Sequence, residues 1–171
     1  MLEKKNIYLV GPMAAGKSTI GKLLAQKLGK HFYDTDAELI KSTGVEVALI
    51  FELEGEQGFR KRESEKLGEL AQLDGAVIAT GGGIVLKEGN RELLSRTGRV
   101  VYLKCSVEQQ LKRTRFDTKR PLLQTENPRA KLEELMALRA PLYEEVADIT
   151  MSTDKNNSKR IINKLLDKLI S

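Results

Sequence analysis

Short apolar runs alternate along the chain with longer segments in which apolar residues recur every three or four positions. The runs predict β-strands, and the longer segments predict amphipathic helices. The predicted strands are 6–10, 31–33, 76–79, 99–103 and 149–151, and the predicted helices are 16–28, 37–43, 45–53, 59–73, 107–113, 128–145 and 159–170. Strands that alternate with helices in this way favour an α/β fold with a mainly parallel sheet.

Glycines and apolar positions define these elements further. Gly29, Gly44 and Gly55 follow helical segments and are expected to end them. The run 76–79 is apolar throughout, which is typical of a strand covered on both faces. In the segment 128–145, the side chains predicted to face the core are Leu132, Leu135, Met136 and Leu138. The segment 114–125 is polar, charged and poorly periodic, so it is predicted to be irregular.

The composition is that of a soluble globular protein. The chain has 171 residues, of which 40% are hydrophobic and 31% are charged, so we expect a single domain over 1–171. No apolar run is long enough to span a membrane, and the amino terminus leads directly into the first strand without room for a signal peptide. Cys105 is the only cysteine, so no internal disulfide can form, and we expect a buried, inert thiol. We therefore expect a monomeric, cytoplasmic protein with no membrane partner.

The net charge of +5 allows two interpretations, a nucleic-acid-binding protein or an enzyme with anionic ligands. Basic residues form no long run, aromatic residues make up only 5% of the chain, and no RRM, KH or helix-turn-helix motif is present. The sequence therefore favours small phosphate and carboxylate ligands over nucleic acid.

Residues 11–19 (GPMAAGKST) fit the P-loop pattern G-x-x-x-x-G-K-[ST] and lie between a predicted strand and a predicted helix, as that motif requires. Gly11 and Gly16 let backbone N–H groups approach phosphate oxygens, and the helix adds its positive dipole end. Lys17 can reach the β- and γ-phosphates, and the Ser18 hydroxyl can ligate Mg²⁺. We therefore expect a nucleoside triphosphate with magnesium rather than an ordinary glycine-rich turn. The expected nucleotide contacts are Gly11, Ala14, Ala15, Gly16, Lys17, Ser18 and Thr19.

Two carboxylates, Asp34 and Asp36, follow the second predicted strand. Alternation along an extended chain would put both on one side, where they could hold Mg²⁺ or a hydroxyl nucleophile. The alternative is that Asp36 caps the helix that begins at residue 37. The nearby P-loop favours the functional interpretation.

Gly81, Gly82 and Gly83 follow the third predicted strand. They suggest a ligand pressed against bare backbone, with a flexible turn as the alternative. Arg60 and Glu63 lie three positions apart on one face of a predicted helix. An arginine oriented by a glutamate can bind a carboxylate, although from spacing alone a surface ion pair is the more frequent outcome.

Basic residues crowd the irregular stretch 114–125, just after Arg113. Such a segment beside a phosphate site could be a lid that closes over the nucleotide, or it could be a solvated loop. Arg139 lies two positions before Pro141, which by itself indicates an interruption of the helix rather than a site.

Together these motifs resemble the shikimate kinase family. They are G-x-x-x-x-G-K-S-T at 11–19, D-T-D at 34–36, F-R-x-x-E at 59–63, G-G-G at 81–83, R-P-L-L at 120–123 and R-x-P-L-Y at 139–143. The P-loop occurs in many families, whereas the combination of the other motifs is far more specific. The resemblance covers nearly the whole chain. It implies a three-layer α/β/α fold of the nucleoside-monophosphate-kinase type, with a five-stranded parallel sheet in the order 2-3-1-4-5.

The resemblance also implies transfer of the γ-phosphoryl group of ATP to the 3-hydroxyl of shikimate, within aromatic amino-acid biosynthesis. Helices at about 36–63 would bind shikimate, with Glu63 orienting Arg60. The implied substrate contacts are Asp36, Arg60, Gly81, Gly82, Gly83 and Arg139. The implied catalytic residues are Lys17, Asp36 and Arg120.

The remaining implied roles concern the nucleotide and the metal. Ser18 would ligate Mg²⁺ directly, and Asp34 would lie in its outer shell. Arg113 would stack near adenine, Arg120 would reach the phosphates from the lid at about 114–125, and Asn156 would lie in the loop that touches adenine.

One position departs from the pattern of the family. Ala14 stands where the family often has glycine, and a positive φ at this position would strain the backbone by about 1–2 kcal/mol. Two alternative functions are a kinase of the same fold acting on gluconate or a nucleoside monophosphate, and a nucleotide-dependent switch. The two arginines and Asp36 favour shikimate, and the chain has no guanine-reading N-K-x-D stretch.

Overall fold

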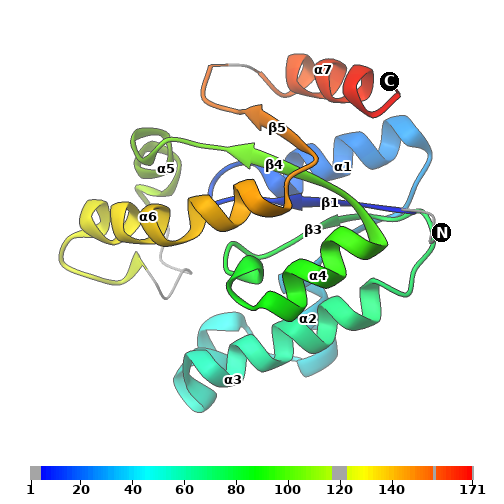
Figure 1. The fold of residues 1–171 in the computed structure, drawn as a ribbon. Helices are drawn as coiled ribbons and strands as arrows, with labels where there is room; N and C mark the ends of the chain where they lie inside the picture. Colours follow the sequence, from blue (N-terminus) through cyan, green and yellow to red (C-terminus); the bar gives the residue numbers. More distant parts are fainter. Residues whose placement is uncertain (1–4, 117–122, 156, 171) are drawn as a thin grey trace.

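A parallel five-stranded sheet forms the centre of the computed structural model, which describes residues 5–116, 123–155 and 157–170 (Figure 1). Its strands are β1 (Asn6–Val10), β2 (Phe32–Asp34), β3 (Val77–Ala79), β4 (Gly98–Lys104) and β5 (Ile149–Ser152). They are hydrogen-bonded in parallel in the order β2-β3-β1-β4-β5. The predicted α/β fold, its parallel sheet and the strand order 2-3-1-4-5 are therefore confirmed.

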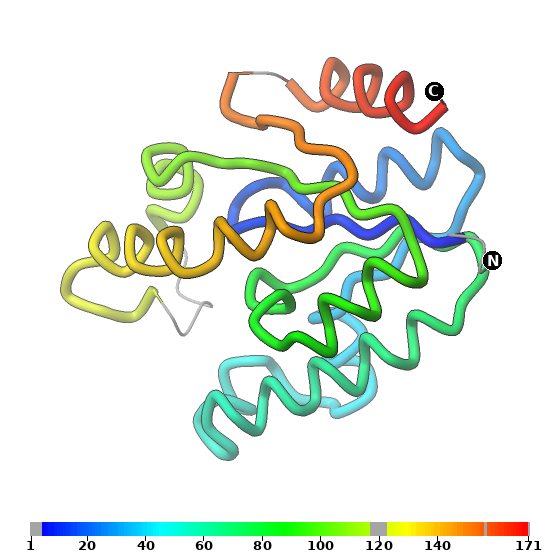
Figure 2. Tube along the Cα trace, in the orientation of Figure 1, coloured from blue at the N-terminus to red at the C-terminus, as the bar shows by residue number. Residues whose placement is uncertain are grey.

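Helices cover both faces of this sheet (Figures 1 and 2). They are α1 (Lys17–Leu28), α2 (Thr35–Thr43), α3 (Val47–Leu70), α4 (Glu88–Thr97), α5 (Val107–Thr114), α6 (Pro128–Val146) and α7 (Ser158–Ile170), with a short 3₁₀ helix η1 (Ile84–Leu86) before α4. Helices α1 and α7 pack on one face, and α3, α4 and α6 pack on the other. The molecule thus has the expected three layers.

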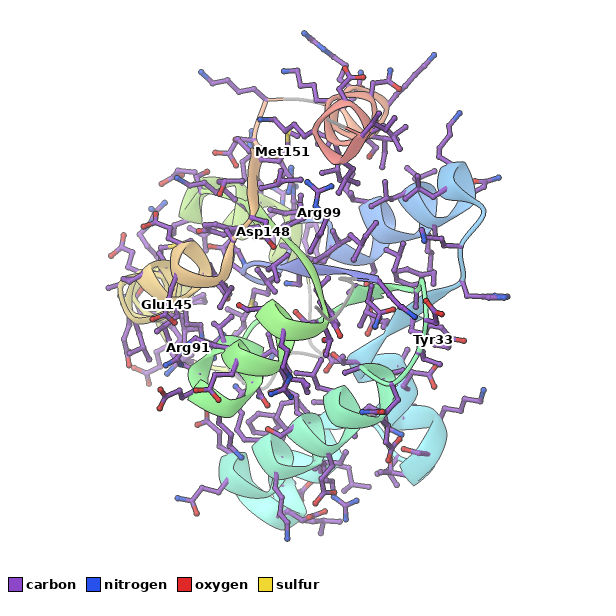
Figure 3. All side chains as sticks on the ribbon, turned by 45° about the vertical axis from the view of Figure 1, so that its right-hand side comes forward. Tyr33, Arg91, Arg99, Glu145, Asp148 and Met151 are labelled. Atoms are coloured by element: carbon purple, nitrogen blue, oxygen red, sulfur yellow. The ribbon has the colours of Figure 1, made fainter. Side chains whose placement is uncertain are left out.

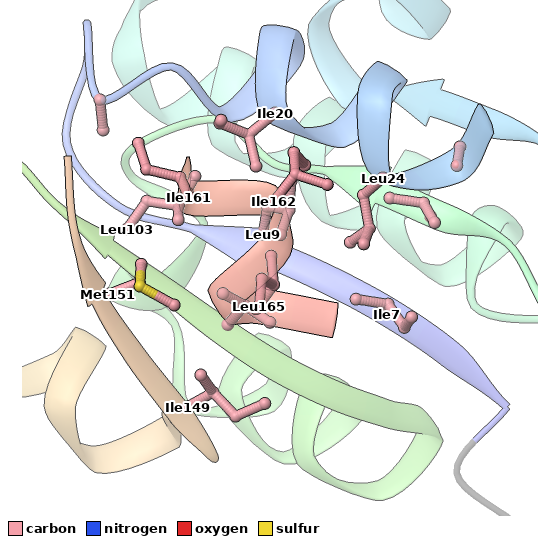
Figure 4. Packing of buried hydrophobic residues seen from close by; sticks show 14 of the residues in the cluster. Ile7, Leu9, Ile20, Leu24, Leu103, Ile149, Met151, Ile161, Ile162 and Leu165 are labelled. Atoms are coloured by element: carbon pink, nitrogen blue, oxygen red, sulfur yellow. The ribbon is translucent and has the colours of Figure 1, made fainter. Parts of the chain in front are cut away.

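Alternation along the strands divides the core between the two faces. Ile7 and Leu9 of β1 pack with Ile20, Leu24 and residues of α7 on one face, as Figure 4 shows. Tyr8 and Val10 point to the other face and pack with residues of α3, α4 and α6. Because both faces of β1 are buried, the strand places its carboxyl end rigidly at the P-loop.

Left-handed glycines end or break the helices where the sequence predicts it. Gly29 follows α1 with φ 66°, and Gly44 follows α2 with φ 76°. Gly55 has φ 72° and ψ −179° inside α3, so that helix consists of two helical pieces that meet at a break. The two predicted segments 45–53 and 59–73 correspond to these pieces, although the second ends at Leu70.

Several sequence predictions about the helices were wrong. Asp34 caps α2, which begins at Thr35, so Asp36 is not the cap but lies in the first turn. Leu138 was predicted to face the core but is 58% exposed, whereas Leu132 is buried. The pattern also did not predict η1 and α4. Helix α4 is fixed to α6 by an ion pair in which Arg91 Nε lies 2.6 Å from Glu145 Oε2 (Figure 3).

Two predictions from composition can be compared with the fold. Cys105 is buried, and burial raises the pKa of its thiol, which fits an inert cysteine. Across the described ranges, no helix combines the length and the apolar character that crossing a bilayer would require.

Candidate functional site

The P-loop, the D-T-D motif and the glycine triplet meet at the carboxyl ends of β1, β2 and β3. They line one cavity of about 410 Å³. Its lining residues are Met13, Ala14, Ala15, Gly16, Lys17, Ser18, Thr19, Asp34, Asp36, Thr80, Gly81, Gly82, Arg113 and Thr114. The structure therefore brings together most of the predicted nucleotide and metal residues with part of the predicted substrate residues.

Two residues of the P-loop have a left-handed backbone conformation. Gly16 has φ 89° where α1 begins, and Ala14 has φ 65°. At Gly11, φ is 149° and a Cβ would overlap the carbonyl oxygen of Leu103, so only glycine fits there. Ala14 therefore has the positive φ that the sequence analysis considered. Its backbone is strained, because left-handed φ values are unfavourable for residues with a Cβ.

The two residues after Gly16 have distinct partners. Lys17 Nζ donates hydrogen bonds to the carbonyl oxygens of Gly11 at 2.5 Å and Pro12 at 2.9 Å, so the ammonium lies across the mouth of the loop. Ser18 Oγ donates to Asp34 Oδ2. The other oxygen of Asp34, Oδ1, accepts from the backbone N–H groups of Asp36 at 3.0 Å and Ala37 at 3.1 Å.

Asp36 reaches the site from a helix rather than from an extended chain, so the predicted alternation of Asp34 and Asp36 was wrong. A Cβ placed on Gly81 would lie 3.3 Å from Asp36 Oδ1 and 2.6 Å from Glu63 Oε2. The carboxylates of Asp36 and Glu63 thus face the same glycine from two different helices. Thr35 Oγ1, which is fully buried, accepts a hydrogen bond of 3.0 Å from the Gly81 N–H and holds that loop to α2.

Arg60 and Glu63 form a buried ion pair on the second piece of α3. Arg60 Nη1 lies 3.0 Å from Glu63 Oε1, and their side chains are only 11% and 1% exposed. The surface-pair alternative is therefore wrong. Burial raises the pKa of the Glu63 carboxyl above its ordinary value, while the Arg60 guanidinium opposes that shift and the Asp36 carboxylate adds to it.

Arg139 is the second buried arginine, only 4% exposed. Burial lowers the pKa of its guanidinium, and the positive charge of Arg60 lowers it further. Helix α6 continues through Pro141 to Val146, so the motif is not an interruption of the helix. One turn after Arg139, the buried Tyr143 donates its hydroxyl to the carbonyl oxygen of Gly82 at 2.5 Å.

The three glycines make room for these charged side chains. A Cβ on Gly83 would overlap the guanidinium of Arg60, and a Cβ on Gly82 would lie 3.3 Å from Arg139 Nη1. None of the three has a positive φ, so the reason for glycine here is space and not backbone conformation. The sequence predicted a ligand pressed against this backbone, which stays a prediction; the groups that the structure places next to Gly82 and Gly83 include the side chains of Arg139 and Arg60.

Arg113 lies in α5, within the predicted helix 107–113. Its Nη1 donates to the Ala14 carbonyl oxygen at 2.7 Å, and its Nη2 donates to the Thr153 carbonyl oxygen at 2.9 Å. It thus joins the P-loop to the segment after β5, which is where the sequence placed the adenine. Arg120, Asn156 and the middle of the predicted lid lie outside the described residues.

Three site residues were missed from the sequence, namely Thr35, Tyr143 and the buried Gln110 of α5. Thr35 and Tyr143 lie inside the quoted motifs D-T-D and R-x-P-L-Y, which could have drawn attention to them. Gln110 carries no signal of its own in the sequence.

Comparison with known proteins gives consistent similarities. The family model described as shikimate kinase matches residues 13–170. A shikimate kinase of Haemophilus influenzae is 55% identical over 98% of this chain and 93% of its own length. A shikimate kinase of Actinobacillus pleuropneumoniae is 53% identical over 98% of this chain and 96% of its own length.

Solved structures agree. Shikimate kinase from Acinetobacter baumannii, solved in complex with shikimate, superposes with a TM-score of 0.95 at 49% identity, covering 97% of this chain and 93% of that one. A gluconokinase from Sinorhizobium meliloti superposes with a TM-score of 0.60 at 17% identity, which shows a shared fold alone.

Proposed function

The chain belongs to the shikimate kinase family, and from this premise we propose that it transfers the γ-phosphoryl group of ATP to the 3-hydroxyl of shikimate. The observation that carries the proposal is the pair of buried arginines, Arg60 and Arg139, that converge beside the P-loop with Asp36 and Glu63. Arg60 is already paired with Glu63 and Glu56, whereas no ion pair of Arg139 is found among the described residues. A ligand carboxylate would supply the buried Arg139 guanidinium with an anionic partner.

Substrate recognition divides into a carboxylate end and a hydroxyl end. We assign the carboxylate of shikimate to Arg60 and Arg139, with Glu63 orienting Arg60 through their 3.0 Å contact. Gly81, Gly82 and Gly83 would form the floor, and Asp36 would accept from ring hydroxyls. The substrate segment 36–63 and the 3-hydroxyl as acceptor follow from the resemblance to the family.

The nucleotide would occupy the loop from Gly11 to Thr19, next to Asp36 in the same cavity. Lys17 would leave the Gly11 and Pro12 carbonyls and bind the β- and γ-phosphates. As the γ-phosphoryl group transfers, Asp36 is positioned to accept the proton of the attacking hydroxyl. Charge stabilisation by Lys17 and by the backbone N–H groups is the largest part of such catalysis. The lid arginine Arg120 remains part of this proposal.

The residues present fit a magnesium ion of the kind that phosphate transfer uses. Ser18 Oγ and Asp34 Oδ2 lie in hydrogen-bonding contact and present hard oxygen ligands toward the phosphate site. No group of three acidic, histidine or cysteine side chains gathers in the described part of the chain, which suits an ion held mainly by phosphates and water. When bound, Mg²⁺ would neutralise charge on the phosphates. We propose Ser18 as a direct ligand and Asp34 as an outer-shell ligand.

The remaining parts of the proposal concern the setting of the enzyme. We propose a monomer that acts in the cytoplasm within aromatic amino-acid biosynthesis, without nucleic-acid or membrane partners. The buried, unpaired Cys105 is compatible with a reducing compartment.

A coupled assay of ADP release tests the function. The purified protein would be offered ATP and Mg²⁺ with shikimate, quinate, gluconate or nucleoside monophosphates. We expect kcat/KM for shikimate to exceed that for the others by on the order of a hundredfold, because the proposed site matches both the carboxylate and the ring hydroxyls of shikimate. Equal or faster turnover of gluconate would favour the alternative kinase assignment.

A further inference from the structure

Gln110 is a buried amide whose position connects the two halves of the site. It lies on α5 and is 2% exposed. Its Nε2 donates a hydrogen bond of 3.1 Å to the carbonyl oxygen of Met13, in the middle of the P-loop. A buried amide is costly to retain unless its polar groups are bonded, so this contact defines the orientation of the side chain.

The bond to Met13 also determines where a neighbouring N–H points. The carbonyl of Met13 and the N–H of Ala14 belong to one planar, trans peptide unit and therefore point in opposite directions. When Gln110 holds the carbonyl against α5, the Ala14 N–H is turned away from α5. Met13 and Ala14 both line the 410 Å³ cavity, so the peptide that Gln110 orients belongs to the wall of the proposed phosphate site.

Gln110 also shares a small cavity with Arg139. Gln110 lines a small cavity of about 10 Å³ together with Arg139 and Tyr143, and the remaining walls are Pro12, Met13, Leu132, Leu135 and Met136. Gln110 Oε1 and Arg139 Nε are both buried and have no hydrogen-bond partner among the residues that the structure describes. One is an acceptor and the other is a donor. A cavity of this size holds one water molecule.

We propose that Gln110 is a positioning residue, and that one buried water joins its Oε1 to Arg139 Nε. Gln110 then holds the P-loop peptide through its Nε2 and the substrate arginine through the water. This chain of bonds joins a phosphate-binding N–H to the guanidinium that binds the substrate carboxylate. The assignment of Arg139 to a substrate carboxylate rests on the proposed function, whereas the contact with the P-loop does not.

The decisive variant is Gln110→Met, which keeps the length and approximate volume of the side chain and removes both hydrogen bonds. We expect the Kd for ADP and the Kd for shikimate, each measured by calorimetry, to rise about fivefold, as loss of one hydrogen bond implies. The matched control is Asn6→Leu. Asn6 is an equally buried amide at the amino end of β1, bonded to the Ala76 N–H at 2.9 Å and remote from the P-loop. Asn6→Leu should lower thermal stability without changing either Kd.

A second variant separates the two bonds. The carboxylate of Gln110→Glu keeps an acceptor for the water but loses the donor to Met13. We expect weaker ADP binding with shikimate binding close to that of the wild type. A high-resolution crystal structure of the wild type should show one water within hydrogen-bonding distance of Gln110 Oε1 and Arg139 Nε.

The outcomes are distinct. Unchanged affinities in Gln110→Met, or equal losses in Asn6→Leu, would overturn the positioning role. A cavity without that water, or equal effects of Gln110→Glu on both ligands, would overturn the link to Arg139. If the wild type does not bind shikimate, the proposed function fails, while the ADP affinity and the position of the water still test the inference about Gln110.

Discussion

At residue scale, Gly83 shows how the glycine triplet supports binding. A Cβ there would overlap the Arg60 guanidinium, so Gly83→Ala must displace that side chain. We expect the shikimate KM to rise about tenfold or more, as for a lost hydrogen bond to a charged group, while the Kd for ADP stays within about twofold. Steady-state kinetics and calorimetry measure the two. The control is Gly89→Ala, whose Cβ would meet no atom within 4 Å. It should leave both values unchanged, and an equal rise in KM there would contradict the argument.

Ala14 is the second residue whose geometry can be tested directly. Its φ of 65° costs about 1–2 kcal/mol for an L residue, and glycine removes that cost while adding unfolded-state entropy. Ala14→Gly should therefore raise the free energy of unfolding by about 0.5–1 kcal/mol, measured by denaturant titration. Ala15→Gly is the matched control. Ala15 is buried and has no positive φ, so this change should destabilise the protein. Destabilisation by both variants would show that Ala14 is not strained.

Residue-scale chemistry was largely predictable from the sequence, because motifs such as the P-loop fix the backbone locally. The roles of Asp34 and Asp36 were less predictable. Both side chains are equally able to cap a helix, and only the tertiary position of Ser18 decides which one does. The burial of the Arg60–Glu63 pair was also out of reach, because it depends on the fit between α3 and a glycine loop distant in sequence.

At the scale of elements, the break in α3 determines where the proposed substrate residues lie. Its first piece packs through Ile50 against Leu39 and Phe59, and its second piece carries Arg60 and Glu63. Gly55 joins the two with φ 72° and ψ −179°, a conformation that is essentially restricted to glycine. The break therefore positions Arg60 and Glu63 and is not a defect of the helix.

Gly55→Ala tests this role. We expect the free energy of unfolding to fall by about 1–3 kcal/mol, since the variant must adopt a strained backbone or straighten the helix. Straightening would also misplace Arg60 and raise the shikimate KM. Gly68→Ala is the control on the same helix, because its Cβ would meet nothing within 4 Å. It should stabilise the protein by up to about 1 kcal/mol. A neutral Gly55→Ala variant would refute the requirement for glycine.

The wrong predictions about helices share a physical cause. Polar residues occupy positions on the buried faces of these helices. In α6 the inward residues are Leu132, Arg139, Tyr143 and Val146. The charged Arg139 occupies a core-facing position, so the apolar pattern predicted that Leu138, about 100° away around the helix, would face the core. In α4 the buried residues are Asn90 and Leu94, and Asn90 donates to the Ile84 carbonyl oxygen. An element with so few apolar residues on its buried face gives no periodic signal.

At the scale of the whole molecule, the proposed nucleotide and substrate sites share one edge of the sheet but use different side chains. Lys17 is the first residue of α1, directly after the P-loop, whereas Arg139 comes from α6 in the carboxyl-terminal part of the chain. A ligand that binds only the folded state raises the stability of the entire molecule by an amount that grows with the logarithm of the ratio of its concentration to its Kd. Global unfolding can therefore report on each site separately, without relying on turnover.

We therefore predict that the matched substitutions Lys17→Met and Arg139→Met each weaken the binding of a different ligand. At a concentration of 100 times the wild-type Kd, either an ATP analogue or shikimate should stabilise the wild type by about 2.7 kcal/mol. Lys17→Met should reduce the gain from the analogue to roughly 1.4 kcal/mol or less and leave the gain from shikimate intact, because a charged hydrogen bond contributes about 1.5–3 kcal/mol. Arg139→Met should reduce the gain from shikimate and leave the gain from the ATP analogue intact. Thermal unfolding with each ligand measures all four cases.

The same experiment distinguishes loss of a contact from loss of the fold. Arg139 is buried, so Arg139→Met is expected to change the stability of the ligand-free protein, whereas Lys17 lies at the cavity. Each gain is therefore taken relative to the same variant without ligand.

Lys17→Met should also abolish ADP release with shikimate, since the lysine stabilises the transferring charge. Near-normal turnover in that variant, or a parallel loss of both gains in both variants, would show that the nucleotide and substrate sites were wrongly assigned.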